Sequence, residues 1–227
     1  MLANTLYLTF HGIGAPVVEP AQGELKYFVS ANVYRRTIEM LEFLEKQTAI
    51  SAHVTFDDGN LSDYTVGLPA LLEHGRRGTF FVLADRIGRE GYLSAAQIRE
   101  IAAAHMQIGT HGHDHVDWRY LDQAGVEREL VFARKKIEDV LGSAVTTASV
   151  PFGRFDRQLL RRLKALGYAR VFTSSTGLTC DRGFLCPRRS LTSSFDPNME
   201  LASLANSDEK LRGAFYDVAR RLRYSQW

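Results

Sequence analysis

The sequence predicts an α/β fold, a distorted barrel of parallel strands covered by helices. Short apolar runs alternate with longer amphipathic stretches along the 227 residues, and this alternation is typical of strand–helix units in a parallel sheet. About six such units favour a barrel over an open sheet. The chain contains no internal repeat, low-complexity tract or Pro/Ser-rich linker, so residues 1–227 are predicted to form a single domain.

The strands are predicted from short runs rich in β-branched and aromatic side chains, of which Thr-Leu-Tyr-Leu-Thr-Phe at 5–10 is the first. The other expected strands cover residues 51–56, 79–83, 107–110, 146–150 and 169–173.

The helices are predicted from apolar residues at helical spacing, with Gly75, Gly142 and Gly167 as helix ends. Ser94 and Gln97 have the spacing of a capping box. The expected helices cover residues 32–47, 62–74, 94–105, 122–141, 156–166 and 207–222.

The composition limits the partners of the protein. Lys plus Arg (28) nearly balances Asp plus Glu (26), and the net charge of +2 gives no reason to expect nucleic acid or an anionic membrane. No run approaches the ~18 apolar residues that span a bilayer. The chain has no export signal, which predicts a cytoplasmic protein; an envelope or secreted location follows if a leader was removed. The oligomeric state is not indicated.

Polar motifs follow three predicted strands directly. Asp57-Asp58, the segment 111–115 (His-Gly-His-Asp-His) and the segment 151–153 (Pro-Phe-Gly) each begin where a strand ends. In a parallel α/β barrel the loops after the strands meet on one face, where active sites lie. The three segments are therefore expected to form one site.

The residue types in these loops suit a catalytic metal centre. His111 and His115 are four residues apart, so one helical turn would bring both imidazoles to the same side. Two histidines and one carboxylate form a catalytic metal set with open positions. Adjacent carboxylates at 57 and 58 crowd each other as ligands, so one is expected to bind the metal while the other takes a proton, as hydrolysis of an amide or ester requires.

These motifs resemble those of a known enzyme family. The segments 55–59 (Thr-Phe-Asp-Asp-Gly), 111–115 and 151–153 have the order and approximate spacing of the polysaccharide deacetylases, the NodB-homology domain of carbohydrate esterase family 4. The segment 78–82 (Gly-Thr-Phe-Phe-Val) is also similar to the corresponding part of the family. The resemblance extends from about residue 50 to 175.

The resemblance implies a role for each matching residue. Asp57 would be the catalytic base, and Asp58, His111 and His115 would hold a divalent metal, commonly zinc in the family. The backbone N–H of Phe152 would help to bind the oxyanion. The implied fold is the distorted (β/α) barrel of the NodB-homology type, and the implied reaction removes acetyl from an N-acetylated sugar.

Two departures from the family pattern mark the chain as divergent. The family carries an arginine two residues before the proline of the third motif, where this chain has Ser149. Arg188 or Arg189 could fold back to replace it, although an exposed basic turn is the expectation favoured for either one alone.

The second departure concerns the proton donor. The late Leu-x-His motif is absent, because no histidine follows His115. His11, just past the first strand, is predicted to be the general acid, as though the motif were permuted to the N-terminus. The alternative is a histidine that merely packs there. Structural or surface roles are expected for the other histidines, with His113 pointing away from the metal.

Trp118 and Tyr120, in a polar stretch after the histidine motif, are predicted to line the substrate groove. The sequence thus predicts a metal-dependent hydrolase that deacetylates N-acetylated sugars of a polysaccharide or oligosaccharide, in exopolysaccharide or cell-envelope metabolism. Two alternatives stay open: an amidohydrolase acting on a small cyclic imide or ureide, and a non-catalytic carbohydrate-binding relic. The complete Asp-Asp and His-His set argues against the relic.

Overall fold

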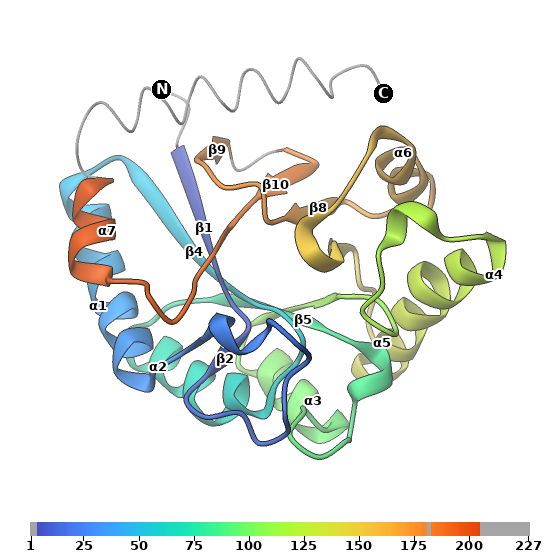
Figure 1. The fold of residues 1–227 in the computed structure, drawn as a ribbon, viewed down its shortest axis with the longest axis horizontal. Coiled ribbons are helices and arrows are strands. Elements are labelled where there is room, and N and C mark those ends of the chain that lie inside the picture. Colours follow the sequence, from blue (N-terminus) through green and yellow to red (C-terminus); the bar gives the residue numbers. More distant parts are fainter. Residues whose placement is uncertain (1–3, 181–182, 205–227) are drawn as a thin grey trace.

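A computed structural model describes residues 4–180 and 183–204 (Figure 1), so the helix predicted at 207–222 lies outside the described residues. The strands are β1 (Asn4–Phe10), β2 (Gly12–Ile13), β3 (Phe28–Val29), β4 (Ile50–Phe56), β5 (Gly78–Val82), β6 (Gln107–Thr110), β7 (Thr147–Ser149), β8 (Arg170–Thr173), β9 (Thr179–Cys180), β10 (Leu185–Pro187) and β11 (Arg189–Ser190). The α-helices are α1 (Ala31–Gln47), α2 (Leu68–Glu73), α3 (Ala95–Ala103), α4 (Gln123–Val126), α5 (Ala133–Leu141), α6 (Arg157–Ala165) and α7 (Pro197–Ser203).

Eight parallel strands form the main sheet in the order β10-β8-β7-β6-β5-β4-β1-β11. Helices surround the strands, and α7 lies beside α1 (Figure 1). The short strand β9 adds to β1 in the antiparallel sense. The distorted (β/α) barrel predicted from the alternation is confirmed.

The ends of the sheet are joined by one short segment. Strand β10 pairs with β8 at one edge, and β11 pairs with β1 at the other. Only Arg188 separates these two strands, so the chain crosses from one edge of the sheet to the other at this residue. The crossing nearly closes the barrel and places Arg188 at the seam.

Side-chain hydrogen bonds cap the N-termini of helices at positions that the sequence predicts. The Ser94 hydroxyl accepts a hydrogen bond from the Gln97 backbone N–H, and the Gln97 side chain accepts one from Ser94 N–H, which confirms the capping box. The Asp122 side chain caps α4 by accepting a hydrogen bond from the Gly125 backbone N–H. The long helix predicted at 122–141 is α4 and α5 joined by a π-helical turn, Glu127–Phe132, and it ends at Gly142 with φ of 69°.

The barrel and its helices enclose separate apolar clusters. A small cluster fills the barrel interior, because its members come from β1, β5, β8 and β10 and from no helix: Tyr7, Phe81, Phe172 and Cys186. The largest cluster lies between the sheet and helices such as α1 and α3. Of the helices in the described ranges, none combines the length and apolar character that crossing a bilayer demands.

Candidate active site

The loop after β4 places two buried carboxylates side by side. The backbone N–H of Asp57 donates to the Phe10 carbonyl at 2.9 Å, which ties the loop to the end of β1. Asp58 and Gly59 follow with φ of 75° and 68°, in the left-handed region. Such a conformation is costly for a non-glycine residue and is frequent at functional sites. Both carboxylates are buried.

The histidine loop after β6 corrects one expectation. Residues 111–115 are not a helical turn, because Gly112 and His115 adopt left-handed φ values of 92° and 58°. A Cβ atom at residue 112 would stand 2.6 Å from the Glu129 carboxylate, so the tight turn requires glycine. The turn still brings the rings of His111 and His115 to a centroid distance of 5.0 Å.

Three donors converge as a metal site requires. The Nε2 atoms of His111 and His115 each lie 3.7 Å from Oδ1 of Asp58, the separation expected for ligands placed about 2.1 Å from a tetrahedral ion, roughly 3.4 Å. Within the described part of the chain, this buried Oδ1 makes no hydrogen bond. The donor set therefore fits a divalent cation. His113 instead contacts Asp114, outside this set, as the sequence predicts.

Burial keeps the imidazoles of His111 and His115 neutral, which is the form that binds a cation. Nδ1 of His111 lies 2.8 Å from the Ser149 carbonyl, which selects the tautomer with a free lone pair on Nε2. Burial lowers the pKa of His111 to about 3, and it lowers the pKa of His115 as well. Burial raises the pKa of Asp58 to about 6. Neutral histidines beside a carboxylate that lacks a partner are typical of a binding site for a cation.

Asp57 is held by Arg188, which lies fully buried at the barrel seam. The guanidinium donates to both carboxylate oxygens of Asp57, from Nη1 to Oδ1 and from Nη2 to Oδ2, each at 2.7 Å. Ser149 adds a hydroxyl hydrogen bond to Oδ2 at 3.0 Å and accepts one from Arg188 at 2.7 Å. The expectation of an exposed basic turn is therefore wrong for Arg188. Arg189 is partly exposed and pairs with Glu200.

The surroundings of Arg188 make this ion pair strong. Its guanidinium lies over the rings of Phe81 and Phe172, at 5.2 and 5.7 Å from their centroids, on top of the interior cluster. Burial alone would raise the pKa of Asp57, but the charge of Arg188 and its hydrogen bonds to the carboxylate outweigh burial and hold the pKa well below its ordinary value. Asp57 is therefore ionised at neutral pH.

His11 lies beside the same carboxylate. Its Nε2 atom is 4.0 Å from Oδ2 of Asp57, and its ring packs against Tyr27 at a centroid distance of 4.9 Å. The His11 carbonyl accepts a hydrogen bond from the Asn60 side chain. His11 and Asp57 both line one cavity.

Glu129 anchors the histidine loop by hydrogen bonds to its backbone. This fully buried carboxylate, in the π-helical turn 127–132, accepts hydrogen bonds from the backbone N–H groups of His113 at 2.8 Å and Asp114 at 3.1 Å. Both N–H groups lie between the two histidines of the candidate metal set. Such π-helical turns occur frequently at functional sites.

We expect Glu129→Ala to lower zinc affinity by about tenfold or more, because the loop loses two backbone anchors. Unfolding free energy should fall by roughly 2–4 kcal/mol, since two N–H groups lose a buried acceptor. Glu129→Gln, which keeps one acceptor oxygen, should lose less of both. Zinc titration and denaturant melts measure the two effects, with exposed Glu127→Ala as the control. Unchanged zinc affinity in Glu129→Ala would remove the anchoring role.

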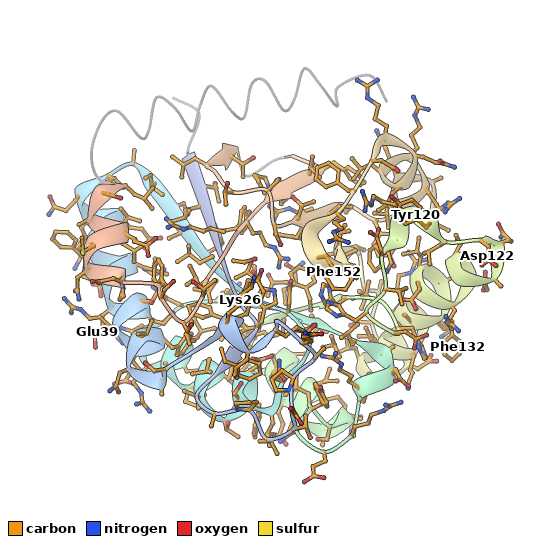
Figure 2. The ribbon with its side chains drawn as sticks, viewed as in Figure 1. Lys26, Glu39, Tyr120, Asp122, Phe132 and Phe152 are labelled. Carbon is orange, nitrogen blue, oxygen red and sulfur yellow. The ribbon has the colours of Figure 1, made fainter. Side chains whose placement is uncertain are left out.

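The aromatic residues near the motifs divide into three environments. Trp118 is fully buried in a core with residues of α6, so the prediction that it lines the substrate groove is wrong. Tyr120 is 77% exposed but does not line the cavity. Figure 2 shows Tyr120 on the far side of Phe152 from Lys26, between Phe152 and Asp122. Phe152 does line the cavity, with φ of 58° and its ring 4.5 Å from that of His115.

These groups open into a cavity of about 940 Å³, larger than one sugar ring needs. Its lining includes Asp57, Asp58, His11, His111 and His115. The segment 16–28, between β2 and β3, forms one wall, which the sequence patterns do not reveal. The loops after β1, β4, β6 and β7 thus meet at one cavity, as the barrel topology predicts.

Comparisons with known proteins agree with this arrangement. The family model described as polysaccharide deacetylase matches residues 45–171. YxkH of Bacillus subtilis (strain 168), assigned to the polysaccharide deacetylases, is 27% identical over 124 residues, 55% of this chain and 44% of its own length. A chitin deacetylase of Arthroderma benhamiae is 30% identical over 124 residues, 52% of this chain and 32% of its own length. The match thus spans less than half of either relative.

A solved structure shares the fold. The polysaccharide deacetylase BC0361 of Bacillus cereus superposes with a TM-score of 0.74 over 89% of this chain and 69% of its own, at 20% identity. At that identity the likeness concerns the fold alone. The family model, in contrast, covers more than half of the sequence and includes all three motif loops. The resemblance seen in the motifs is therefore confirmed: this chain belongs to the polysaccharide deacetylase family.

Proposed function

We propose that this chain is a metal-dependent hydrolase that removes acetyl groups from N-acetylated sugars of a polysaccharide or oligosaccharide, such as an exopolysaccharide or a cell-envelope glycan. Membership of the deacetylase family supports an enzyme that acts on acetylated carbohydrate. The observation that carries the finer proposal is the pairing of two adjacent carboxylates with different partners. Asp58 faces two neutral imidazoles, whereas Asp57 is ionised and bound to Arg188.

This division gives each carboxylate one task. Asp58, His111 and His115 would hold the divalent cation, and their nitrogen and carboxylate donors suit zinc. When bound, such an ion would act as a Lewis acid at the amide carbonyl. Asp57 would accept the proton of the attacking water, since Arg188 and Ser149 fix its carboxylate beside the donor set.

Two further groups would act on the substrate. The backbone N–H of Phe152 would donate to the oxyanion, at a turn held in the left-handed region. His11 would give a proton to the leaving amine, because it faces the cavity next to Asp57. In this proposal His11 replaces the late histidine of the family, as though that motif were permuted to the N-terminus.

The direct experiment is acetate release by zinc-loaded protein. The purified chain is given N-acetylglucosamine oligomers and, separately, an aryl acetate. Acetate from the oligomers, lost when a chelator removes the metal, is the expected result. No acetate from either substrate, with bound zinc confirmed, would exclude the proposal. A cyclic imide or ureide as the only hydrolysed compound would establish the small-molecule alternative.

His11→Ala should separate proton donation from the rest of the chemistry. On N-acetylglucosamine oligomers we expect kcat to fall by about 10²–10⁴-fold, because the amine leaves poorly without a proton. On the aryl acetate the loss should be much smaller, since a phenolate leaves unprotonated. His53→Ala, on β4 and not among the residues that line the cavity, is the control. Equal losses on both substrates would contradict the general-acid role.

A further inference from the structure

Three cations that line the active-site cavity each lie over an aromatic ring that also lines it. They come from three different loops, after β2, β5 and β7, so the pattern is not one local cluster in the sequence. The pairs are Lys26 over Tyr27 at 5.1 Å, Arg86 over Tyr92 at 4.8 Å and Arg154 over Phe152 at 5.5 Å from the ring centroid.

The protein itself engages these cations only weakly. Arg86 donates no hydrogen bond to any described residue, and its nearest carboxylate oxygen, Oδ1 of Asp58, is 3.7 Å away, beyond hydrogen-bond reach. Arg154 lies 3.6 Å from Asp117, but Asp117 already accepts a 2.7 Å bond from Arg119. Within the described ranges, Lys26 has no carboxylate partner. The nitrogen donors of these side chains therefore stay available to a ligand.

Most of the carboxylates that line the cavity, in contrast, have partners within the protein or belong to the candidate metal set. Asp57 is bound by Arg188, and Asp114 lies 3.1 Å from Arg128 and contacts His113. Glu24 is the exception, because its nearest partner is Nδ1 of the neutral His115, at 3.5 Å. Asp58 is the carboxylate of the candidate metal set. With Asp58 assigned to the metal, three cations (Lys26, Arg86 and Arg154) face one carboxylate that no cation neutralises, so the charge that the cavity offers to a ligand is positive.

We propose that the substrate of this cavity is an acidic glycan, in which the N-acetylated sugar is next to a carboxylate or phosphate group. This inference rests on the proposed function and adds the substrate class to it. The rings of Tyr27, Tyr92 and Phe152 can stack on sugar faces. The guanidinium groups beside them match the planar, bidentate geometry of carboxylate and phosphate oxygens. Arg86, only 22% exposed by side chain and closest to the candidate metal set, contributes most.

The test compares matched oligosaccharides on zinc-loaded protein. The first alternates N-acetylglucosamine with glucuronic acid, the second is the same oligomer with its carboxyl groups reduced to alcohols, and the third carries a phosphate instead. Acetate release gives kcat/KM, and calorimetry gives the binding affinity for each. We expect the acidic oligomers to exceed the neutral one by about tenfold or more in both measurements, with a preference that shrinks as salt rises. Comparison of the glucuronic acid oligomer with the phosphate oligomer shows which anion the cavity prefers.

Variants assign the preference to these side chains. Arg86→Gln should lower kcat/KM for the acidic oligomer by about tenfold and leave the neutral one within about twofold. Arg154→Gln should give a smaller loss of the same kind. Arg89→Gln, on the same loop but paired with Asp85, is the matched control and should change neither. Zinc content measured in each variant separates these effects from loss of the ion.

Two results would overturn the inference. The first is equal affinity and equal kcat/KM for acidic and neutral oligomers. The second is an equal loss on both in Arg86→Gln, which would place Arg86 at the reacting amide instead of at a substrate anion. If no oligomer releases acetate, the proposed function fails, but calorimetry still decides whether the cavity prefers acidic glycans.

Discussion

Asp57→Asn should lower the rate of acetate release by about 10²–10⁴-fold while the protein still binds zinc. The substitution keeps the shape of the side chain but removes its capacity to accept a proton from water. The candidate metal set does not include Asp57, so zinc affinity should change little. Single-turnover acetate release and zinc titration on the same sample measure the two properties separately.

The control for this variant is a charge-matched change on the surface. Asp139→Asn removes an exposed carboxylate of α5, whose ion-pair partner in the described part of the chain is Lys135, and should leave the rate unchanged. Full activity in Asp57→Asn would show that the base lies elsewhere. Loss of zinc together with activity would show that Asp57 is itself a ligand.

Arg188→Met should produce the largest loss of stability, roughly 3–5 kcal/mol of unfolding free energy at neutral pH. The guanidinium is fully buried and makes two 2.7 Å bonds to Asp57. Without it, the Ser149 hydroxyl is the one hydrogen-bond donor left to this buried carboxylate side chain among the described residues. Denaturant melts with a chelator present measure this loss free of any contribution from the metal.

The stability lost in Arg188→Met should depend on pH in a direction that the pKa of Asp57 sets. Arg188 holds the pKa of Asp57 well below its ordinary value, so the ion pair stabilises the fold at pH values above the unfolded pKa of about 3.9. That stabilisation is lost as the pH falls further, towards the folded pKa. In Arg188→Met, where burial is no longer offset by the cation, the buried carboxylate takes up a proton at higher pH than in the wild type. The stability difference between wild type and Arg188→Met should therefore be greatest at neutral pH and narrow as the pH falls through the raised pKa of Asp57 in the variant.

The loss of Arg188 should also change the pH dependence of catalysis. Burial raises the pKa of Asp57 once the cation is gone, so the acidic limb of the pH–rate profile should move to higher pH in Arg188→Met. Arg188→Lys should recover part of both effects, since it restores the charge but not the paired bonds. Arg189→Met, which loses a partly exposed pair with Glu200, is the matched control. An unmoved acidic limb would contradict the role given to Arg188.

The barrel and the meeting of the three motif loops could be predicted because that information is local. Each motif directly follows an apolar strand, and parallel strands bring such loops to one face. The position of Arg188 is not local information. Pro187 and two arginines look like an exposed turn, and only the pairing of β10 with β8 and of β11 with β1 shows that residue 188 faces inward.

The two errors near the histidine motif have the same origin. Trp118 stands in a polar stretch, which suggests a groove, but residues of α6 that are about 40 positions away in sequence cover it. The helical turn expected for His111 and His115 depends on spacing alone. The actual turn depends on Gly112, which adopts a left-handed φ and whose lack of a Cβ atom leaves room for the Glu129 carboxylate.

The central claim is that Asp58, His111 and His115 hold one divalent cation, and zinc titration of the wild type and of the Asp58→Asn/His115→Ala double variant tests it most directly. The wild type should bind one equivalent of zinc, and the double variant, shown to be folded by circular dichroism, should bind at least about a hundredfold more weakly. Equal affinity in the two proteins would show that the cation, if one binds, is held by other residues.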